Sequence, residues 1–267
     1  MTKRLLMQSD DYGITDGVSA GIRRAIEYGL IRNTGMFVNM PCAARAAEEI
    51  RDMDVCLGID INYVCGRPVS DPSQVPHLIN GQGYFRSSGE VTSNNKRIGT
   101  DELGLVTYFE KDPYPYEEIL LETENQVKRF IELNGKLPEY IHPHSLMSEN
   151  CYKAAKATAD KYGIIHTLDM MHCCRILPGT FDGTKGSTAE TQMEYDVAGN
   201  LLNRAIPLIC EGETCYFICH CGYVDYDLFK NTTLTLRRVK DLAAMTDDRV
   251  KKCIEDNGIT LITYREL

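Results

Sequence analysis

Short apolar runs alternate along this chain with longer segments in which apolar positions recur every three or four residues. The run at 4–8 is typical of a strand, and the segment at 16–29 has the apolar spacing of one helix face. Strands that alternate with helices predict a parallel sheet covered by helices. Further strands are predicted at 33–38, 55–61, 139–144, 163–169, 215–220 and 258–264, and further helices at 41–52, 116–134, 149–162, 232–243 and 247–256.

The length of the chain agrees with one large α/β domain. A (β/α) barrel typically needs roughly 250 residues, and this chain has 267 without a repeat or a linker. We therefore expect residues 1–267 to form a single barrel, which is complete, incomplete or seven-stranded. Residues 66–116 interrupt the pattern, because Gly, Pro, Ser and Asn are frequent there. They predict a loop-rich insertion, for which a lid is one role. The stretch from 170 to about 188 is also expected to be irregular.

The charge of the chain argues against nucleic acid as a partner. The formal net charge is −9, which leaves no excess of basic residues to neutralise a phosphate backbone. No apolar run approaches the roughly 18 residues of a membrane span. The first apolar run is also too short for a secretory signal, so a cytoplasmic location with reduced cysteines is expected. A homodimer is left open.

Acidic and histidine residues follow several of the predicted strands, at the point where each strand ends. In (β/α) barrels the carboxyl ends of the strands meet on one side, and sites are assembled there from separate loops. Aspartate and neutral histidine together suit a divalent ion such as Zn²⁺ or Mg²⁺. The residues in these positions are Asp10, Asp11, Asp60, His142, His144 and His220.

Each of these clusters also has a purely structural interpretation. Residues 10–13 can cap a helix and form a turn. His142 and His144 lie on one face of an extended segment, but the proline between them is equally typical of a turn. Asp60 alone is typical of a cap or a charge partner, and His220 alone of a core histidine. The prediction of a site therefore depends on their shared position.

The segment CYFICHC at 215–221 is a rival metal site, because it contains thiolates and an imidazole. Strand alternation places Cys215, Cys219 and Cys221 on one face and His220 on the other. We therefore expect these thiols to pack in the core behind the site.

Several ordered segments resemble the YdjC-like carbohydrate deacetylase family. QSDDYG near the start is similar to the family's ADDFG motif, and GKLPEYIHPH is similar to its third motif. The segments 57–85 and 219–225 and the C-terminal GITLITYREL extend the likeness over nearly the whole chain. The resemblance implies a (β/α) barrel of the glycoside hydrolase/deacetylase type. It also implies metal-dependent removal of an N-acetyl group from an amino sugar or a short oligosaccharide.

The resemblance implies roles for individual residues. Asp11, Asp60 and His144 would bind a divalent metal, Mg²⁺ or Zn²⁺, with Mn²⁺ as a further alternative. Asp10 would be the general base and His220 the general acid. Residues expected to contact the substrate or to support these groups are Tyr12, His142, His166 and Thr167, and Tyr12, Tyr63 and Tyr84 are candidates for stacking on sugar rings.

The chain departs from the family pattern at several of these positions. Asp60 stands where the family has a histidine ligand, and His142 stands where it has an aspartate. Thr167 replaces an arginine, and Cys221 replaces a proline. A shell of two aspartates and one histidine carries one more negative charge than the family's shell, which favours Mg²⁺ or Mn²⁺ relative to Zn²⁺. Two alternatives stay open: a catalytically altered sugar-binding or regulatory barrel, and a metal-dependent hydrolase of another amide or ester.

Overall fold

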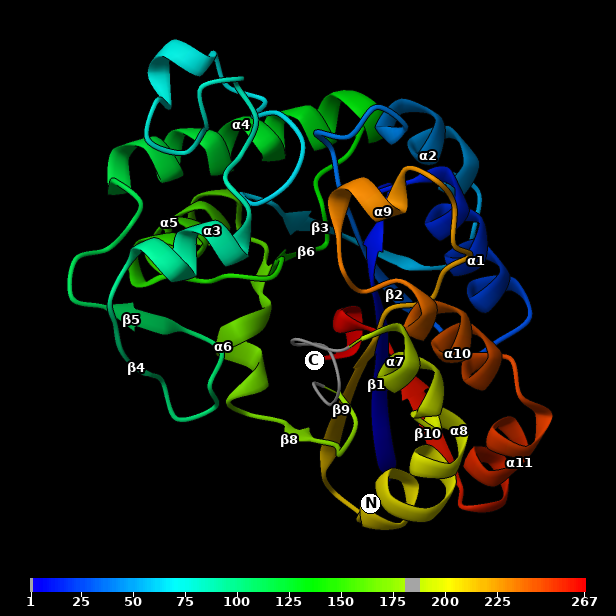
Figure 1. Cartoon of the computed structure of the whole chain (residues 1–267). Coiled ribbons are helices and arrows are strands. Elements are labelled where there is room, and N and C mark those ends of the chain that lie inside the picture. Colours follow the sequence, from blue (N-terminus) through cyan, green and yellow to red (C-terminus); the bar gives the residue numbers. More distant parts are fainter. Residues whose placement is uncertain (1, 181–187) are drawn as a thin grey trace.

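The computed structural model describes residues 2–180 and 188–267. Its centre is a curled parallel sheet with the strand order β7-β6-β3-β2-β1-β9-β8, and β10 also pairs with the first half of β1 (Figure 1). In the described part of the chain the edge strands β7 and β8 do not pair with each other, so the barrel is incomplete. The strands are β1 (Lys3–Tyr12), β2 (Asn33–Met36), β3 (Cys56–Ile61), β6 (Tyr140–Pro143), β7 (Ile165–His166), β8 (Arg175–Ile176), β9 (Thr214–Cys219) and β10 (Ile259–Ile262).

Helices surround the curled parallel sheet (Figure 1), which confirms the predicted α/β class. Figure 1 shows two groups of helices that flank the sheet, with α1, α2, α10 and α11 to the right of β1 and α4 and α5 to its left. The structured helices follow the predicted segments closely, because their apolar positions recur at helical spacing over two turns or more. They are α1 (Asp16–Glu27), α2 (Ala43–Ile50), α4 (Tyr116–Asn134), α5 (Glu149–Tyr162), α10 (Leu236–Met245) and α11 (Asp248–Asp256); shorter ones are α3 (Ser88–Asn94), α6 (Thr167–Met171), α7 (Ala189–Glu194), α8 (Val197–Asn200) and α9 (Leu228–Asn231).

Tyrosines fill the inside of the sheet. The ring of Tyr140 on β6 lies directly over Gly58 on β3, and the rings of Tyr140 and Tyr264 have centroids 4.2 Å apart. Tyr216 on β9 meets Tyr264 through their hydroxyl groups, which are 2.8 Å apart. All three tyrosines are buried. The hydroxyl groups of Tyr216 and Tyr264 satisfy each other's hydrogen bonds there, whereas the Tyr140 hydroxyl has no hydrogen-bond partner among the described residues.

Two predictions for the loops were incomplete. The insertion between β3 and α4 contains α3 and a hairpin of β4 (Arg97–Thr100) and β5 (Thr107–Phe109), besides its loops. These elements are only three to seven residues long, too short to show a periodicity.

The predicted strand at 163–169 was wrong beyond His166, because α6 begins at Thr167. The predicted irregular stretch contains β8, and its residues 181–187 lie outside the described residues.

No helix among the described residues is both long and apolar enough to cross a bilayer.

The close packing of Gly58 predicts a large cost for one added methyl group. A Cβ at this position would lie 2.4 Å from two ring atoms of Tyr140, so Gly58→Ala must displace the ring or the strand. We expect Gly58→Ala to lower the free energy of unfolding by about 1–3 kcal/mol, measured by urea denaturation. Gly81→Ala is the matched control, because no heavy atom lies within 4 Å of its added Cβ. Equal stability of the two variants would contradict this packing.

Candidate active site

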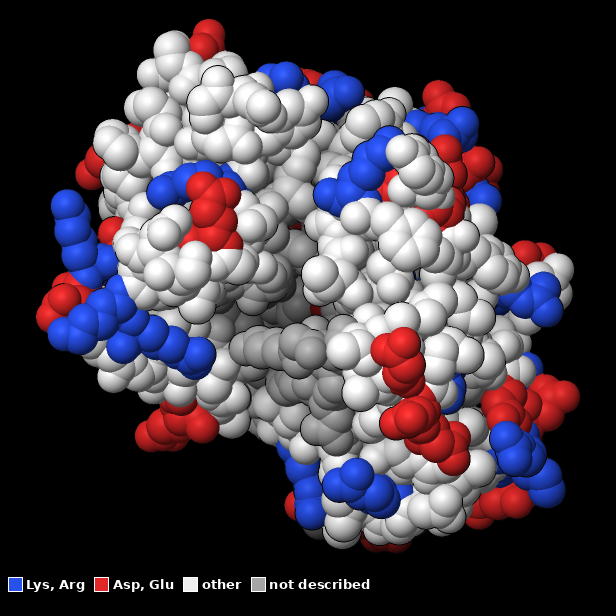
Figure 2. Space-filling model, in the orientation of Figure 1, with Lys and Arg blue, Asp and Glu red and all other residues white. Residues whose placement is uncertain are grey.

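The candidate site lies where the carboxyl ends of β1, β3, β6 and β9 meet. Because these strands are parallel, their carboxyl ends lie at the same end of the sheet, and the predicted residues are all found there. Figure 2 shows a hollow between the part of the molecule built by the insertion and the part that carries α9 and α1, with acidic atoms visible inside it. The predicted convergence of the strand ends is therefore what the structure shows.

An irregularity at the end of β1 sets two consecutive carboxylates into the site. The pairing of β1 with β2 shifts register between Ser9 and Tyr12. Asp11 has a φ of 73°, a left-handed conformation that is uncommon for residues other than glycine. Its backbone N–H donates to Asp60 Oδ2 at 2.7 Å, and this bond helps to hold the strained residue in place. The bulge thus allows Asp10 and Asp11 both to face the histidines of other strands.

Asp11 is held by charges from two distant parts of the chain. Its Oδ1 lies 2.8 Å from His144 Nδ1, and its Oδ2 accepts a hydrogen bond of 2.6 Å from Arg238 Nη2. Burial by itself raises the pKa of Asp11, but the positive charges of His144 and Arg238 outweigh it and hold the pKa well below its usual value. Asp11 is therefore an ionised carboxylate in a fully buried position.

Asp10 has a different environment on each carboxylate oxygen. Gln8 Nε2 donates to Asp10 Oδ1 at 2.5 Å. Asp10 Oδ2 lies 3.3 Å from His142 Nε2 and 3.9 Å from His220 Nε2. Burial raises the pKa of Asp10, while His142 and His220 lower it further than burial raises it. Thr167 Oγ1 lies 2.7 Å from His142 Nδ1, so it fixes the ring that faces Asp10.

Of the three carboxylates in the site, Asp60 has the fewest positively charged partners among the described residues. It pairs in register with His142 on β6, and its carboxylate lies over Gly35, where an added Cβ would be 1.6 Å from Oδ1. Burial and the negative charges of Asp10 and Asp11 raise its pKa well above the usual value. Asp60 Oδ1 is buried and has no hydrogen-bond partner among the described residues.

The predicted ligands Asp11, Asp60 and His144 are brought together, because Asp11 contacts both of the others. Asp60 Oδ1 has no hydrogen-bond partner among the described residues, and the close partner of Asp11 Oδ1 is the imidazole of the third predicted ligand, His144. Buried carboxylate oxygens of this kind fit a hard divalent cation. The side chains nevertheless bind one another here, and over residues 2–180 and 188–267 no three His, Cys, Asp or Glu are arranged to share an ion. The oxygen and nitrogen atoms of Asp11, Asp60 and His144 are of the kinds that bind a divalent metal, but in this structure they are not arranged around one point that an ion could occupy.

His220 is fixed between β9 and α10. Its backbone N–H donates to Asp241 Oδ2 at 2.9 Å, and the next residue, Cys221, donates its N–H to Ser9 Oγ at 3.0 Å. Burial lowers the pKa of His220, although the carboxylates of Asp10 and Asp11 oppose this. The imidazole is therefore biased towards its neutral form while lying beside two carboxylates.

The cysteines of the rival metal site are packed as core thiols. Cys215, Cys219 and Cys221 are buried, and the Sγ atoms of Cys219 and Cys221 lie 3.7 Å apart. Burial raises the pKa of Cys219, which disfavours the thiolate form that binds metals.

Two tyrosines that were expected to stack on sugar rings are not available for it. Tyr12 is fully buried, and its hydroxyl donates to Ala46 O at 2.7 Å. Tyr63 is also fully buried, with its hydroxyl on Thr123. Neither has a ring face open to a ligand, so the stacking prediction was wrong for both. Tyr84 in the insertion is 43% exposed and keeps this role as a prediction.

His166 faces away from the site. It pairs in register with Ile141, whereas His142 and Thr167 contact each other on the other face of these strands. Its ring lies against Tyr152 on α5, with centroids 5.2 Å apart, and its Nδ1 is 3.2 Å from Asp169. Of the two roles predicted for His166, contact with substrate or support of the site, contact with substrate disagrees with this position, because strand alternation places the ring in the helix layer.

Two residues of the site were missed from the sequence. Gln8 carried a weak signal, as a polar residue inside an apolar strand. Arg238 carried none, because an arginine in a helical segment is usually a solvent-facing residue. Its side chain is 1% exposed and reaches Asp11 across 227 positions of sequence.

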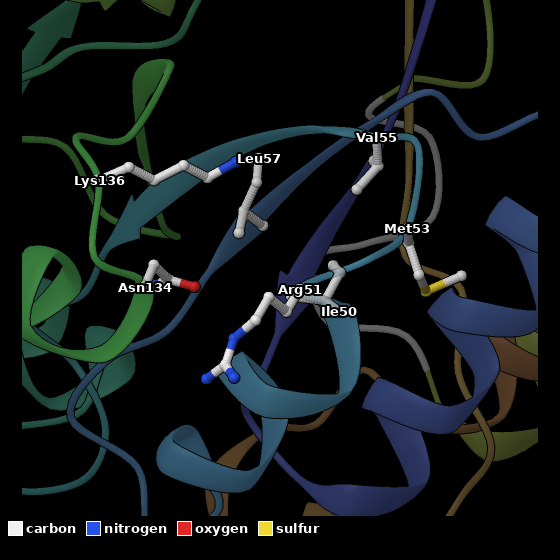
Figure 3. A pocket seen from close by; sticks show the side chains of 7 residues that line it. All are labelled: Ile50, Arg51, Met53, Val55, Leu57, Asn134 and Lys136. Carbon is white, nitrogen blue, oxygen red and sulfur yellow. The ribbon is translucent and has the colours of Figure 1, made fainter.

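A second hollow lies elsewhere on the sheet. Figure 3 shows it at the amino end of β3, the opposite end of that strand from Asp60, so it is separate from the candidate site. It is lined by Ile50, Arg51, Met53, Val55, Leu57, Asn134 and Lys136.

The open parallel barrel and the carboxylates and histidines at its strand ends define an α/β protein of the (β/α)-barrel class. Its family is shown by sequence: the chain belongs to the YdjC-like proteins, whose profile matches residues 4–256. The chain is 29% identical over 271 residues to the carbohydrate deacetylase of Geobacillus stearothermophilus, covering 100% of this chain and 98% of the relative. It is 26% identical to the chitooligosaccharide deacetylase of Klebsiella pneumoniae, with 100% of both chains covered.

Solved structures support the same fold. A crystal structure described as a putative cellobiose-phosphate cleavage protein from Enterococcus faecalis matches with a TM-score of 0.76. The two chains are 22% identical, and the match covers 100% of this chain and 99% of the other. At this level of identity the match shows the fold alone.

The raised pKa of Asp60 predicts a pH-dependent gain from removing its charge. The ionised form opposes folding above the pKa of the unfolded chain, and below that pKa Asp60 is protonated in both states. We therefore expect Asp60→Asn to raise the Tm of the metal-free protein at neutral pH, and the gain to vanish as the pH falls below about 4. Thermal unfolding across this range is the measurement, with the exposed Asp52→Asn as control. A Tm below that of the native protein at neutral pH would contradict the charge argument.

Proposed function

We propose that this protein is a metal-dependent carbohydrate deacetylase, which removes the N-acetyl group from an amino sugar or a short oligosaccharide. The observation that carries the proposal is the buried pair Asp11 and Asp60 beside a second set formed by Asp10 and His220. The first pair offers hard oxygen ligands, and the second offers a proton acceptor and a proton donor. The names of the relatives from Geobacillus and Klebsiella support the same substrate class.

Asp11, Asp60 and His144 are the residues that would bind the divalent metal, Mg²⁺ or Zn²⁺ with Mn²⁺ as an alternative. When bound, such an ion polarises the acetyl carbonyl and lowers the pKa of a neighbouring water. The two aspartates and one histidine favour Mg²⁺ or Mn²⁺ relative to Zn²⁺, because the shell is rich in oxygen and in negative charge. Arg238 on Oδ2 of Asp11 would fix that carboxylate, and Oδ1, which now faces His144, would be the oxygen that turns to the ion.

Asp10 and His220 would move the protons of the reaction. Asp10 Oδ2 accepts a proton from the attacking water as general base, and the water oxygen adds to the acetyl carbon. His220, which burial disfavours as imidazolium but which the carboxylates of Asp10 and Asp11 favour in that form, would have to be protonated to donate from Nε2 to the amine as the carbon–nitrogen bond breaks; acetate and a free amino sugar then leave. Asp10 Oδ2 and His220 Nε2 lie 3.9 Å apart, which is beyond direct hydrogen-bond distance, so the proton taken by Asp10 would return to His220 through a bridging water.

One observation favours a second candidate, a sugar-binding or regulatory barrel. Arg238 and His144 already balance the charge of Asp11 without an ion. The two candidates are separated by metal analysis of the purified protein together with acetate release from a panel of N-acetylated sugars. Bound metal with acetate release supports the deacetylase. Neither metal nor release supports the binding protein, and metal without release from any sugar supports a hydrolase of another amide or ester.

Two neighbouring aspartates predict two different defects. Asp10→Asn removes the base but leaves Asp11, Asp60 and His144, so we expect kcat to fall by roughly 10²–10⁴ fold with metal content unchanged. Asp11→Asn removes a ligand and should lower metal content as well as turnover. Metal per protein chain and kcat are measured for both. A fully active Asp10→Asn would exclude Asp10 as the base.

Asp60→His tests the charge of the ligand set. The change removes one negative charge and adds a nitrogen ligand, so we expect the preference to move from Mg²⁺ or Mn²⁺ towards Zn²⁺. Competition binding of the three ions to native and variant protein measures this directly. An unchanged order of affinities would show that Asp60 does not decide the metal.

A further inference from the structure

We infer that Gln8, together with Tyr216 and Tyr264, is a positioning device that aims a single oxygen of Asp10 at the substrate. The inference rests on the proposed function, because it takes Asp10 as the base. It adds three residues that touch neither the substrate nor the ligand set.

The contacts form one chain of hydrogen bonds from the interior to Asp10. Tyr264 donates its hydroxyl to Gln8 Oε1 at 2.5 Å. The Tyr216 hydroxyl lies 3.1 Å from Gln8 Oε1 and 2.8 Å from the Tyr264 hydroxyl oxygen, so its single proton is shared between these two acceptors. Gln8 Nε2 then donates to Asp10 Oδ1 at 2.5 Å. Gln8, Tyr216 and Tyr264 are at most 1% exposed, so water does not compete for these bonds.

The tyrosines fix which way the amide of Gln8 points. A hydroxyl donor on Oε1 leaves Nε2 directed at the carboxylate, whereas the reversed amide would place Oε1 against a negative oxygen. The Tyr216 hydroxyl is within reach of the same oxygen, so a second donor can hold this orientation of the amide if the first is removed. A buried amide that is satisfied in this way is rigid, because its alternatives would leave polar atoms unpaired.

The consequence for Asp10 is an unequal pair of oxygens. Oδ1 is occupied by Gln8, and Oδ2 is the oxygen near His142 and His220. The carboxylate therefore cannot rotate without losing a short buried hydrogen bond. The oxygen that can accept a proton is therefore Oδ2, and the hydrogen bond from Gln8 to Oδ1 holds it in one position.

Gln8→Met tests this role, because methionine keeps the length of the side chain and removes its donor. Misplacing a reacting group by about 1 Å can cost on the order of 10² in rate, so we expect kcat to fall roughly 10–100 fold. KM should stay within about twofold, because Gln8 does not touch the substrate. The exposed Gln74→Met is the matched control. A native kcat, or a change confined to KM, overturns the inference.

A second background separates positioning from general damage to the fold. In Asp10→Asn protein the base is already absent, so adding Gln8→Met should cause no further loss of kcat. A loss of the same factor in both backgrounds would mean that Gln8 acts independently of Asp10, and the inference would fail.

The tyrosine variants keep the test valid if Gln8→Met does not fold. Tyr216→Phe and Tyr264→Phe each leave one hydroxyl on Gln8 Oε1, so each alone should change kcat by less than about threefold. The double variant should approach the loss expected for Gln8→Met. Tyr28→Phe on the surface controls for the substitution itself. A double variant with native kcat overturns the role of the tyrosines as the anchor.

A readout without turnover separates this inference from the proposed function. The side-chain amide resonance of Gln8 should be protected from hydrogen exchange and should shift in Asp10→Asn but not in Gln74→Met protein. If the native protein releases no acetate and the resonance still responds, the contact stands and the proposed function has failed. If acetate is released and the resonance is unprotected and unresponsive, the positioning inference is overturned.

Discussion

The structure depends on how three buried carboxylates are kept in one place. Asp10, Asp11 and Asp60 are almost inaccessible to water and repel one another, and this burial and repulsion raise the pKa of Asp60. A buried charge is tolerated only when partners surround it. Arg238 supplies a partner for Asp11, and the other partners described above come from β1, β6 and β9. The neighbouring elements can therefore be understood as the supports of one acidic cluster.

Those supports divide the cluster into two parts with different chemistry. Asp11 is tied to a permanent cation and lies next to the least neutralised carboxylate, Asp60, which suits an added metal ion. Asp10 instead meets imidazoles and a neutral amide, which suits proton transfer. The bulge in β1 makes this division possible, because it turns two consecutive residues towards different partners. A regular strand would have sent one of the two to the opposite face.

Particular residues show how far the sequence could be interpreted. The ends of α4 and α5 were predicted to the residue, since local periodicity and capping carry that information. Asp10, Asp11, Asp60, His144 and His220 were predicted as a cluster, because parallel strands must end on the same side. Tyr12 was misjudged because burial by a neighbouring helix leaves no mark on the residue itself. His166 was misjudged because its face depends on the register of β7 against β6, which the local pattern does not give.

The sequence by itself determined the alternation of strands and helices, the family, and which acidic and histidine residues stand at strand ends. Those properties depend on local spacing or on motifs, which a linear pattern records. Tertiary structure alone decided that Arg238 reaches Asp11, that Gln8 binds Asp10, and that His142 rather than His166 faces the carboxylates. These contacts join residues brought together by strand register, by a bulge and by helix docking, and no local pattern encodes them.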